Sequence, residues 1–355
     1  MAQEALTDTK KLCFRGIDCF LVDMQQDGRT VLAIESSCDE TAIAVLRGGR
    51  DLLCSMISSQ MELHARFGGV VPEVASRNHL AAAPVLLEKC LRECDLSSID
   101  AFAATTGPGL AAALMIGTAL AKGLSLASGK PFLAINHMEG HLLSPFFGKK
   151  EIPPHLALIV SGGHTLLVDV RGVGDYHIAG RTLDDAAGEA FDKVARLLGL
   201  GYPGGPSIEK AAREGNSARY DFPRGMRDSG DWNFSFSGLK TSVRYLLEKE
   251  KDANIADLCA SFQEAVTDVL VEKTIRAARY FGHSLIAISG GVSCNKRLQE
   301  RMAEACGAQA LRCCFAEPRF CTDNAAMIAF AASMHLERGR VSDLREDIHP
   351  NFTDF

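Results

Sequence analysis

Three apolar segments, each followed at once by a turn of small polar residues or glycines, constrain the fold of this chain most strongly. The first, VLAIES at residues 31–36, runs into a second apolar stretch and is typical of a β-hairpin. The other two lie in residues 156–170 and 284–302, and in both an apolar strand ends in Ser-Gly-Gly. In α/β proteins, ligands bind at loops that follow the carboxyl ends of strands. The recurrence predicts a duplicated α/β architecture.

The domain organisation follows from the length and from two adjacent prolines. A chain of 355 residues is long enough for two lobes with separate cores. The strand pattern restarts after Pro153 and Pro154, so we expect one lobe over residues 31–153 and a second over 154–321. The last apolar helix, within residues 322–355, is expected to cross back to the first lobe.

Three features bear on the cellular location. Acidic residues interrupt residues 1–30, which fits neither a secretory signal nor a mitochondrial presequence, and we expect this extension to be poorly ordered. The 12 cysteines are scattered without a CxxC pair, which indicates reduced thiols. The apolar run 110–127 contains Gly117 and Lys122, which favours a buried helix over a membrane span. We predict a cytoplasmic protein with no membrane association, the mitochondrial matrix being the alternative.

His137 and His141 lie four residues apart in a segment with helical spacing. Residues at i and i+4 share one face of a helix, so both imidazoles can bind one metal ion. Asp323, in the distant CTDN sequence, is a candidate third ligand. Two imidazoles and one carboxylate, with coordination positions left open, suit Fe²⁺ or Zn²⁺ in a working site. The alternative is a pair of polar histidines on a buried helix.

Glu139 lies between the two histidines and invites comparison with the HExxH sequence of metalloproteases. There the glutamate directly follows the first histidine, about 100° round the helix and near the metal-bound water. Glu139 lies roughly 200° from His137 by the same helical repeat. The spacing therefore predicts metal binding without the general base of a peptidase.

The two Ser-Gly-Gly turns, at Ser161 and Ser289, are candidate anion sites. Glycines at a strand end let backbone N–H groups approach a phosphate, and neighbouring hydroxyls can add donors. A single such turn is also an ordinary hairpin signal. Two of them, each directly after an apolar strand, favour a nucleotide phosphate site between the lobes, although the chain has no Walker sequence.

Two acidic features remain open at this level. Asp185, Glu189 and Asp192 form one stripe of a predicted helix, which fits a solvated face or the border of a ligand site beside the GYPGGP loop. Glu35 directly follows an apolar strand, where polar residues belong at the ligand-binding edge of an α/β sheet. The aromatic-rich segment 233–243 fits an edge strand or a loop over the cleft.

Ten short sequences in this order resemble the tRNA threonylcarbamoyladenosine transferase family, also called TsaD and formerly regarded as a glycoprotein endopeptidase. They are IESSCDET, GGVVPEVASR, TGPGL, NHMEGH, VSGGHT, DDAAGEAFDK, YPGGP, FSFSGLK, SGGVSCN and CTDNAAM. The resemblance implies a two-lobe ATPase fold of the actin-like, sugar-kinase-like and Hsp70-like class, with a central cleft. It also implies transfer of a threonylcarbamoyl group from threonylcarbamoyl-AMP to N6 of the adenosine 3′ of a tRNA anticodon, with release of AMP.

Site residues carry over from the family by position in these sequences. His137, His141 and Asp323 correspond to the metal ligands, and one divalent ion per subunit is expected, with Fe²⁺ favoured and Zn²⁺ as the alternative. The adenylate-binding positions correspond to Ile159, Val160, Ser161, Gly162, Gly163, Asp192, Gly205 and Asn295. Ile159 stands where some relatives have a tyrosine ligand, and Asn136 stands where relatives often have another histidine.

The implied donor is an activated mixed anhydride, so the reaction needs no protein nucleophile. A bound metal would act as a Lewis acid and the glycine turns would hold the AMP leaving group. We assign Glu35 the role of orienting or deprotonating the amine, and expect Glu35→Gln to slow transfer and leave metal content intact.

The implied partners are tRNA, threonylcarbamoyl-AMP or another adenine nucleotide, a paralogous actin-like subunit and a small ATPase. The net charge of −6 is unusual for a tRNA enzyme. The local basic residues are too few for strong phosphate binding alone, so tRNA is expected to bind jointly with the partners. These residues are Arg219, Arg224, Arg227, Lys296, Arg297 and Arg301.

Two alternatives of other classes remain. One is a metalloendopeptidase, which chelator-sensitive peptide cleavage would reveal. The other is a nucleotide-switched scaffold, which would keep its partner binding and cellular role when His141 is replaced.

Overall fold

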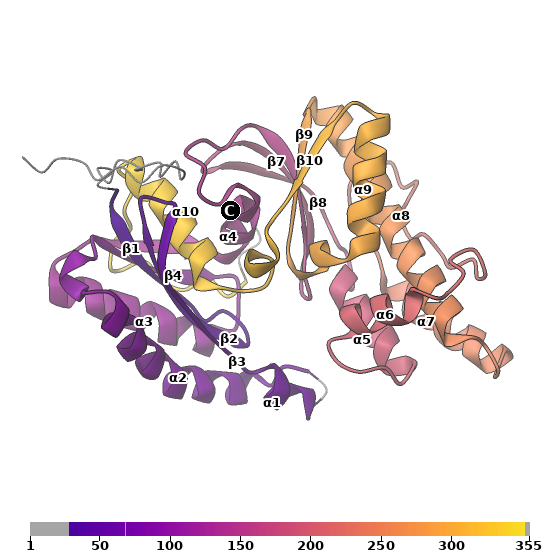
Figure 1. Ribbon diagram of the computed structural model, residues 1–355, viewed down its shortest axis with the longest axis horizontal. Helices are drawn as coiled ribbons and strands as arrows, with labels where there is room; N and C mark the ends of the chain where they lie inside the picture. Colours follow the sequence, from indigo (N-terminus) through magenta and orange to yellow (C-terminus); the bar gives the residue numbers. More distant parts are fainter. Residues whose placement is uncertain (1–27, 68, 352–355) are drawn as a thin grey trace, which may run out of the picture.

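The computed structural model describes residues 28–67 and 69–351, which form two five-stranded sheets side by side (Figure 1). The first has the order β3-β2-β1-β4-β5 and the second the order β10-β9-β6-β7-β8. The strands of the first sheet are β1 (Thr30–Glu35), β2 (Glu40–Arg47), β3 (Asp51–Ser59), β4 (Ala101–Gly107) and β5 (Phe132–Asn136). Those of the second are β6 (His155–Val160), β7 (Thr165–Gly172), β8 (Asp175–Arg181), β9 (Leu285–Ser289) and β10 (Arg312–Phe315).

Both sheets have the same topology. In each, three consecutive strands form an antiparallel meander, and two later strands add in parallel beside the first of the three. The sequence prediction of a duplicated α/β architecture is confirmed. No apolar pattern marks β3 in the sequence, because its residues are mostly exposed or half-buried at the edge of the sheet.

Helices of the first half follow local signals in the sequence. They are α1 (Met61–Ala65), α2 (Pro72–Glu93) and α3 (Ala111–Ser128), with the short 3₁₀ helices η1 (Leu96–Ser98) and η2 (Ser144–Phe146). Pro72 begins α2, where a missing N–H costs nothing. Gly129 ends α3 in the left-handed region, with φ 66°. Among the described residues α3 alone is long and apolar enough to span a membrane, and it packs against β4 and α2.

The second half carries the larger core. Its helices are α5 (Ala187–Leu197), α6 (Gly204–Ala212), α7 (Ser237–Lys249), α8 (Ile255–Phe281) and α9 (Lys296–Ala308), with η3 (Gly291–Cys294) and η4 (Pro318–Phe320). Asparagine side chains cap α8 and α9 at their N-termini, each accepting from backbone N–H groups of the first turn. The core under these helices joins β6 and β9 to α5, α6 and α8.

Two helices lie where the sheets meet, α4 (His137–Leu143) and α10 (Ala325–Glu337) (Figure 1). The late helix α10 packs against β1 and β2 of the first sheet. All seven residues of α4 are buried, between α10 on one side and β6 and β9 on the other. A Cβ on Gly140 would lie 2.8 Å from Ile328 and 3.0 Å from Met327, so glycine permits the close contact of α4 with α10.

Two further expectations concern the N-terminal extension and the cysteines. Residues 1–27 of the predicted extension lie outside the described residues. The ten cysteines within the described ranges are all free thiols, as the absence of a paired cysteine pattern predicted.

Candidate metal and nucleotide site

The structure brings the three predicted metal ligands together at the carboxyl ends of the first sheet. His137 and His141 lie on α4, and Asp323 lies just before α10. The Nε2 atoms of His137 and His141 are 3.3 and 3.0 Å from the same Oδ1 of Asp323. One ligand atom from each residue lies within 4.8 Å of the others. The three side chains can therefore coordinate a single ion.

Glu35 lies behind His137 and not in front of it. Its side chain is fully buried, and its Oε2 accepts from Nδ1 of His137 at 3.0 Å and from the hydroxyl of Thr105 at 2.5 Å. Its Oε1 accepts from the backbone N–H of Ser37 at 2.6 Å. A buried carboxylate with both oxygens bonded cannot reach a substrate amine. This geometry does not favour the role predicted for Glu35 at the amine, and its contacts instead fix the imidazole of His137.

Attraction between His137 and two carboxylates dominates the electrostatics of this cluster. Burial acts to lower the pKa of His137, but Asp323 and Glu35 outweigh it and hold the pKa well above its usual range. Burial acts to raise the pKa of Glu35 and that of Asp323, but His137 outweighs it and lowers both. Both carboxylates are ionised in this arrangement.

These observations fit a divalent cation. Glu35 and Asp323 bring two negative charges, which a divalent ion balances with both imidazoles neutral. Because a carboxylate can only accept, its contact with Nδ1 of His137 places the hydrogen there and leaves Nε2 for the ion. Nδ1 of His141 is buried and has no hydrogen-bond partner among the described residues, while its Nε2 faces Oδ1 of Asp323 at 3.0 Å, on the side of the proposed ion. The donor set suits Fe²⁺ or Zn²⁺.

His164 lies near these ligands, although no sequence pattern marked it as a site residue. It follows the first Ser-Gly-Gly turn, and its backbone N–H donates to the hydroxyl of Ser161 at 3.1 Å. Burial, together with repulsion from His137 and His141, lowers the pKa of His164 to about 4. His164 is therefore a neutral imidazole between the predicted phosphate turn and the metal ligands.

The two Ser-Gly-Gly turns lie beside each other because β6 and β9 pair in parallel, with Ile159 opposite Ser289. Gly290 has a φ of 88°, and a Cβ there would lie 2.4 Å from the carbonyl oxygen of Val160. Only glycine allows this close approach. By contrast, a Cβ on Gly162 or Gly291 would meet no atom within 4 Å. The turns thus present backbone to open space, as an anion site requires.

Ile159 and Val160 have no exposed surface, so their side chains belong to the core and are not directed at a ligand. The side chain of Ile159 packs in a cluster with Met138 and Leu142 of α4. The strand that leads to the first glycine turn is therefore in direct contact with the metal-binding helix.

The other predicted adenylate positions lie in the second lobe. Asp192 accepts from the backbone N–H of Gly204 at 2.7 Å, which fixes the start of α6, and burial raises its pKa. A Cβ on Gly205 would meet no atom within 4 Å, so this turn of α6 is open. Asn295 caps α9, and its amide donates to Gln263 at 2.8 Å.

The acidic stripe predicted from Asp185, Glu189 and Asp192 lies on and just before α5, and its carboxylates have two roles. Asp192 fixes the start of α6, whereas the other two bind a lysine. Lys193 pairs with Asp185 at 2.6 Å and Glu189 at 2.9 Å, which matches the solvated-face interpretation for those two carboxylates. The segment 233–243 is neither of the forms expected, since Phe234 makes one bridge with Thr182 and α7 begins at Ser237.

Glu139 is directed away from the metal ligands. Its carboxylate accepts from the hydroxyl of Tyr176 at 2.7 Å and contacts Nε2 of His335 at 2.9 Å. The prediction that α4 carries no peptidase base at the metal agrees with this geometry.

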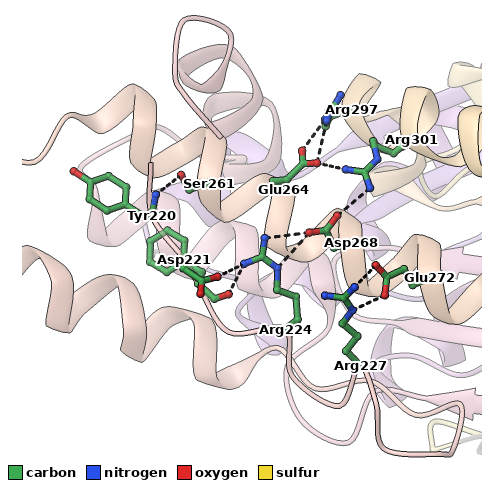
Figure 2. Close-up of polar contacts among 11 residues, drawn as sticks. Tyr220, Asp221, Arg224, Arg227, Ser261, Glu264, Asp268, Glu272, Arg297 and Arg301 are labelled. Carbon is green, nitrogen blue, oxygen red and sulfur yellow. Dashed lines mark hydrogen bonds and ion pairs between the residues drawn. The ribbon is translucent and has the colours of Figure 1, made fainter. Parts of the chain in front are cut away.

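Most of the arginines noted in the sequence are held in ion pairs along α8 (Figure 2). Glu264, Asp268 and Glu272 are spaced by four residues and form one acidic face of this helix. Glu264 binds Arg297 and Arg301 of α9. Asp268 binds Arg301 at 3.1 Å and Arg224 at 3.0 Å. Glu272 binds Arg227 at 2.5 Å. These guanidinium groups are thus engaged within the protein. The sequence EAVTDVLVE, with an acidic residue at every fourth position of a helix, was the signal that could have predicted these ion pairs.

Comparison with known proteins gives one family. Residues 51–330 match the family described as TsaD: tRNA N6-adenosine threonylcarbamoyltransferase. The protein of that name from Thermotoga neapolitana is 50% identical over 324 residues, covering 91% of this chain and 99% of the relative. The protein of the same name from Kosmotoga olearia is 50% identical, covering 90% of this chain and 97% of the relative. That from Syntrophotalea carbinolica is 47% identical, covering 91% of this chain and 96% of the relative.

Solved structures of other proteins share the fold. HypF of T. kodakarensis aligns with a TM-score of 0.57 at 16% identity, over 88% of this chain and 48% of its own. Component A of the Acidaminococcus fermentans (R)-2-hydroxyglutaryl-CoA dehydratase aligns with a TM-score of 0.54 at 12% identity, over 89% and 100%. The similarity shows the fold alone, and it confirms the predicted two-lobe class.

Proposed function

The chain belongs to the tRNA N6-adenosine threonylcarbamoyltransferase family, and we propose that it forms t6A in ANN-decoding tRNAs. In this reaction the N6 amine of the adenosine 3′ of the anticodon attacks the carbamoyl carbon of threonylcarbamoyl-AMP. The bond from that carbon to the phosphate oxygen breaks, the amine gives up a proton, and AMP leaves. The observation that carries the proposal is the contact between the predicted metal helix and the strand of the first glycine turn.

The residues of this chain act mainly by positioning. The backbone N–H groups of Ser161, Gly162 and Gly163 would hold the phosphate of the AMP leaving group, together with the adjacent turn at Gly290. Because the donor is already activated, holding the amine against the face of the carbamoyl carbon supplies much of the rate enhancement.

We assign one divalent ion to His137, His141 and Asp323, with Fe²⁺ favoured and Zn²⁺ as the alternative. When bound there, such an ion supplies Lewis-acid polarisation of the carbamoyl carbonyl or a hold on the threonyl carboxylate or hydroxyl. Glu35 acts through His137, whose Nδ1–H it accepts, and it is a positioning residue.

The proposed partners are tRNA, threonylcarbamoyl-AMP, a paralogous actin-like subunit and a small ATPase, in the cytoplasm or, alternatively, the mitochondrial matrix. Joint binding of tRNA is supported by the ion pairs of Figure 2, which engage arginines that could otherwise bind phosphate. We expect the isolated chain to bind tRNA weakly and with strong salt dependence. Tight, salt-insensitive binding by the chain alone would contradict this.

Mass spectrometry of tRNA nucleosides tests the function. Cells depleted of this protein should lose t6A, the wild-type chain should restore it, and His141→Ala should not. A nucleotide-switched scaffold would instead restore t6A with the variant. A metalloendopeptidase would show chelator-sensitive peptide cleavage by the purified chain, which we do not expect because Glu139 faces away from the ligands.

A further inference from the structure

Glu139 lies at a junction of the two lobes that the proposed reaction does not use. It is buried in the middle of α4, with 6% of its surface exposed. Tyr176, on β8 of the second sheet, donates to Oε1 at 2.7 Å. His335, on the last turn of α10, lies with Nε2 at 2.9 and 3.0 Å from the two carboxylate oxygens. One buried carboxylate thus joins the metal helix to both halves of the protein.

The helix α10 and the residues just before it contact two opposite faces of α4. Asp323, just before the N-terminus of α10, lies at the metal-binding face of α4. His335, three turns later, binds Glu139 on the opposite face. Between them, Gly140 allows Ile328 to pack directly on α4. Any rotation of α4 that moved the histidines would therefore also move Glu139 relative to His335.

The second lobe contacts the same region through the β7–β8 turn. Tyr176 packs with the cluster that contains Met138 and Leu142 of α4. Next to it, a guanidinium nitrogen of Arg340, beyond α10, lies 3.5 Å from the carbonyl oxygen of Val173. Movement of the second sheet relative to α10 would therefore stretch the bond from Tyr176 to Glu139.

From this geometry we infer that Glu139 is a positioning residue that couples the placement of the two lobes to the affinity of the metal site. The carboxylate accepts from both lobes only when α4 has the orientation that directs His137 and His141 at Asp323. By thermodynamic reciprocity, a metal ion that favours this orientation also strengthens the contact of Glu139 with Tyr176. The inference concerns metal binding and does not rest on the transferase activity.

The test is a thermodynamic cycle on Tyr176→Phe, which removes one hydroxyl and keeps the ring. Zn²⁺ affinity is measured by competition with a chelating dye, and unfolding is measured in urea with and without Zn²⁺. Coupling predicts an affinity loss of roughly 5-fold or more, and a larger destabilisation with the ion than without it. Glu139→Gln, which keeps an acceptor oxygen but not the charge, should lose less affinity than Glu139→Ala.

Tyr220→Phe is the matched control. Tyr220 is also buried and its hydroxyl also donates to a glutamate, Glu250 at 3.3 Å, but within the second lobe and away from α4. It should lower stability equally with and without Zn²⁺ and leave affinity unchanged. The inference is overturned if Tyr176→Phe behaves in the same way, or if the wild-type chain binds no Zn²⁺. If Tyr176→Phe does not fold, His335→Leu replaces it, because it removes the other donor to Glu139. The same two results, the change in Zn²⁺ affinity and the change in stability with and without Zn²⁺, then decide.

Discussion

Replacing Glu35 with glutamine should weaken metal binding without unfolding the protein. The carboxylate is fully buried and accepts three hydrogen bonds, from His137 at 3.0 Å, Thr105 at 2.5 Å and Ser37 at 2.6 Å. An amide of the same shape must turn its NH₂ group toward at least one of these donors. It also removes one of the two charges that balance a divalent ion. Loss of a partner that orients a metal-bound histidine typically costs about 10–100-fold in affinity.

The assay is competition between the purified protein and a chelator for Zn²⁺, or for Fe²⁺ without oxygen. We expect the dissociation constant of Glu35→Gln to rise by about 10–100-fold, or about 1.4–2.7 kcal/mol. Ser37→Ala is the control, because its hydroxyl lies 3.2 Å from the same Nδ1 but carries no charge. It should change affinity by less than Glu35→Gln does, because it removes one neutral hydrogen bond and no charge. Equal affinities for Glu35→Gln and the wild type would refute the assignment of Glu35 to His137.

Three further predictions concern stability, each measured by urea denaturation. Gly140→Ala should cost about 1–3 kcal/mol, because its Cβ would lie 2.8 Å from Ile328; no loss would mean that α4 and α10 can separate freely. Asp268→Asn weakens an acceptor shared by two arginines and should cost about 1–3 kcal/mol, whereas an unchanged midpoint would show the ion pairs of α8 to be unimportant. Burial lowers the pKa of His155 from 6.5 to about 4, so the unfolded chain binds a proton that the folded chain does not between these pH values. Stability should therefore fall by roughly 3 kcal/mol from this group as pH drops from 6.5 to 4, and His155→Phe should remove that part of the loss; an identical acid response in the variant would contradict it.

The sequence predicted the parts of the site that depend on local spacing. His137 and His141 share a helix face because of a four-residue spacing, and the two Ser-Gly-Gly turns follow apolar strands that are easy to recognise. The adjacency of the turns depends on the parallel pairing of β6 with β9 within the second sheet, which joins segments that are far apart in the chain.

What the sequence could not provide was the direction of side chains across distant segments. Glu35 ends a strand at the correct edge of the sheet, but only the packing of α4 over it decides whether it faces substrate or His137. The contact of Glu139 with Tyr176 and His335 joins three elements that are far apart in the chain. The edge strand β3 lacks the continuous apolar pattern of its neighbours and gave no comparable signal.

Metal analysis of the purified protein, combined with X-ray absorption spectroscopy, tests the central claim most directly. Loading with Fe²⁺ or Zn²⁺ should give one tightly bound ion per chain, with imidazole and carboxylate ligands in its first coordination sphere. His141→Ala and Asp323→Asn should each abolish tight binding, because each removes one of the three converging atoms. A full complement of metal in either variant, or sulfur ligands in the wild type, would place the ion elsewhere and contradict the account.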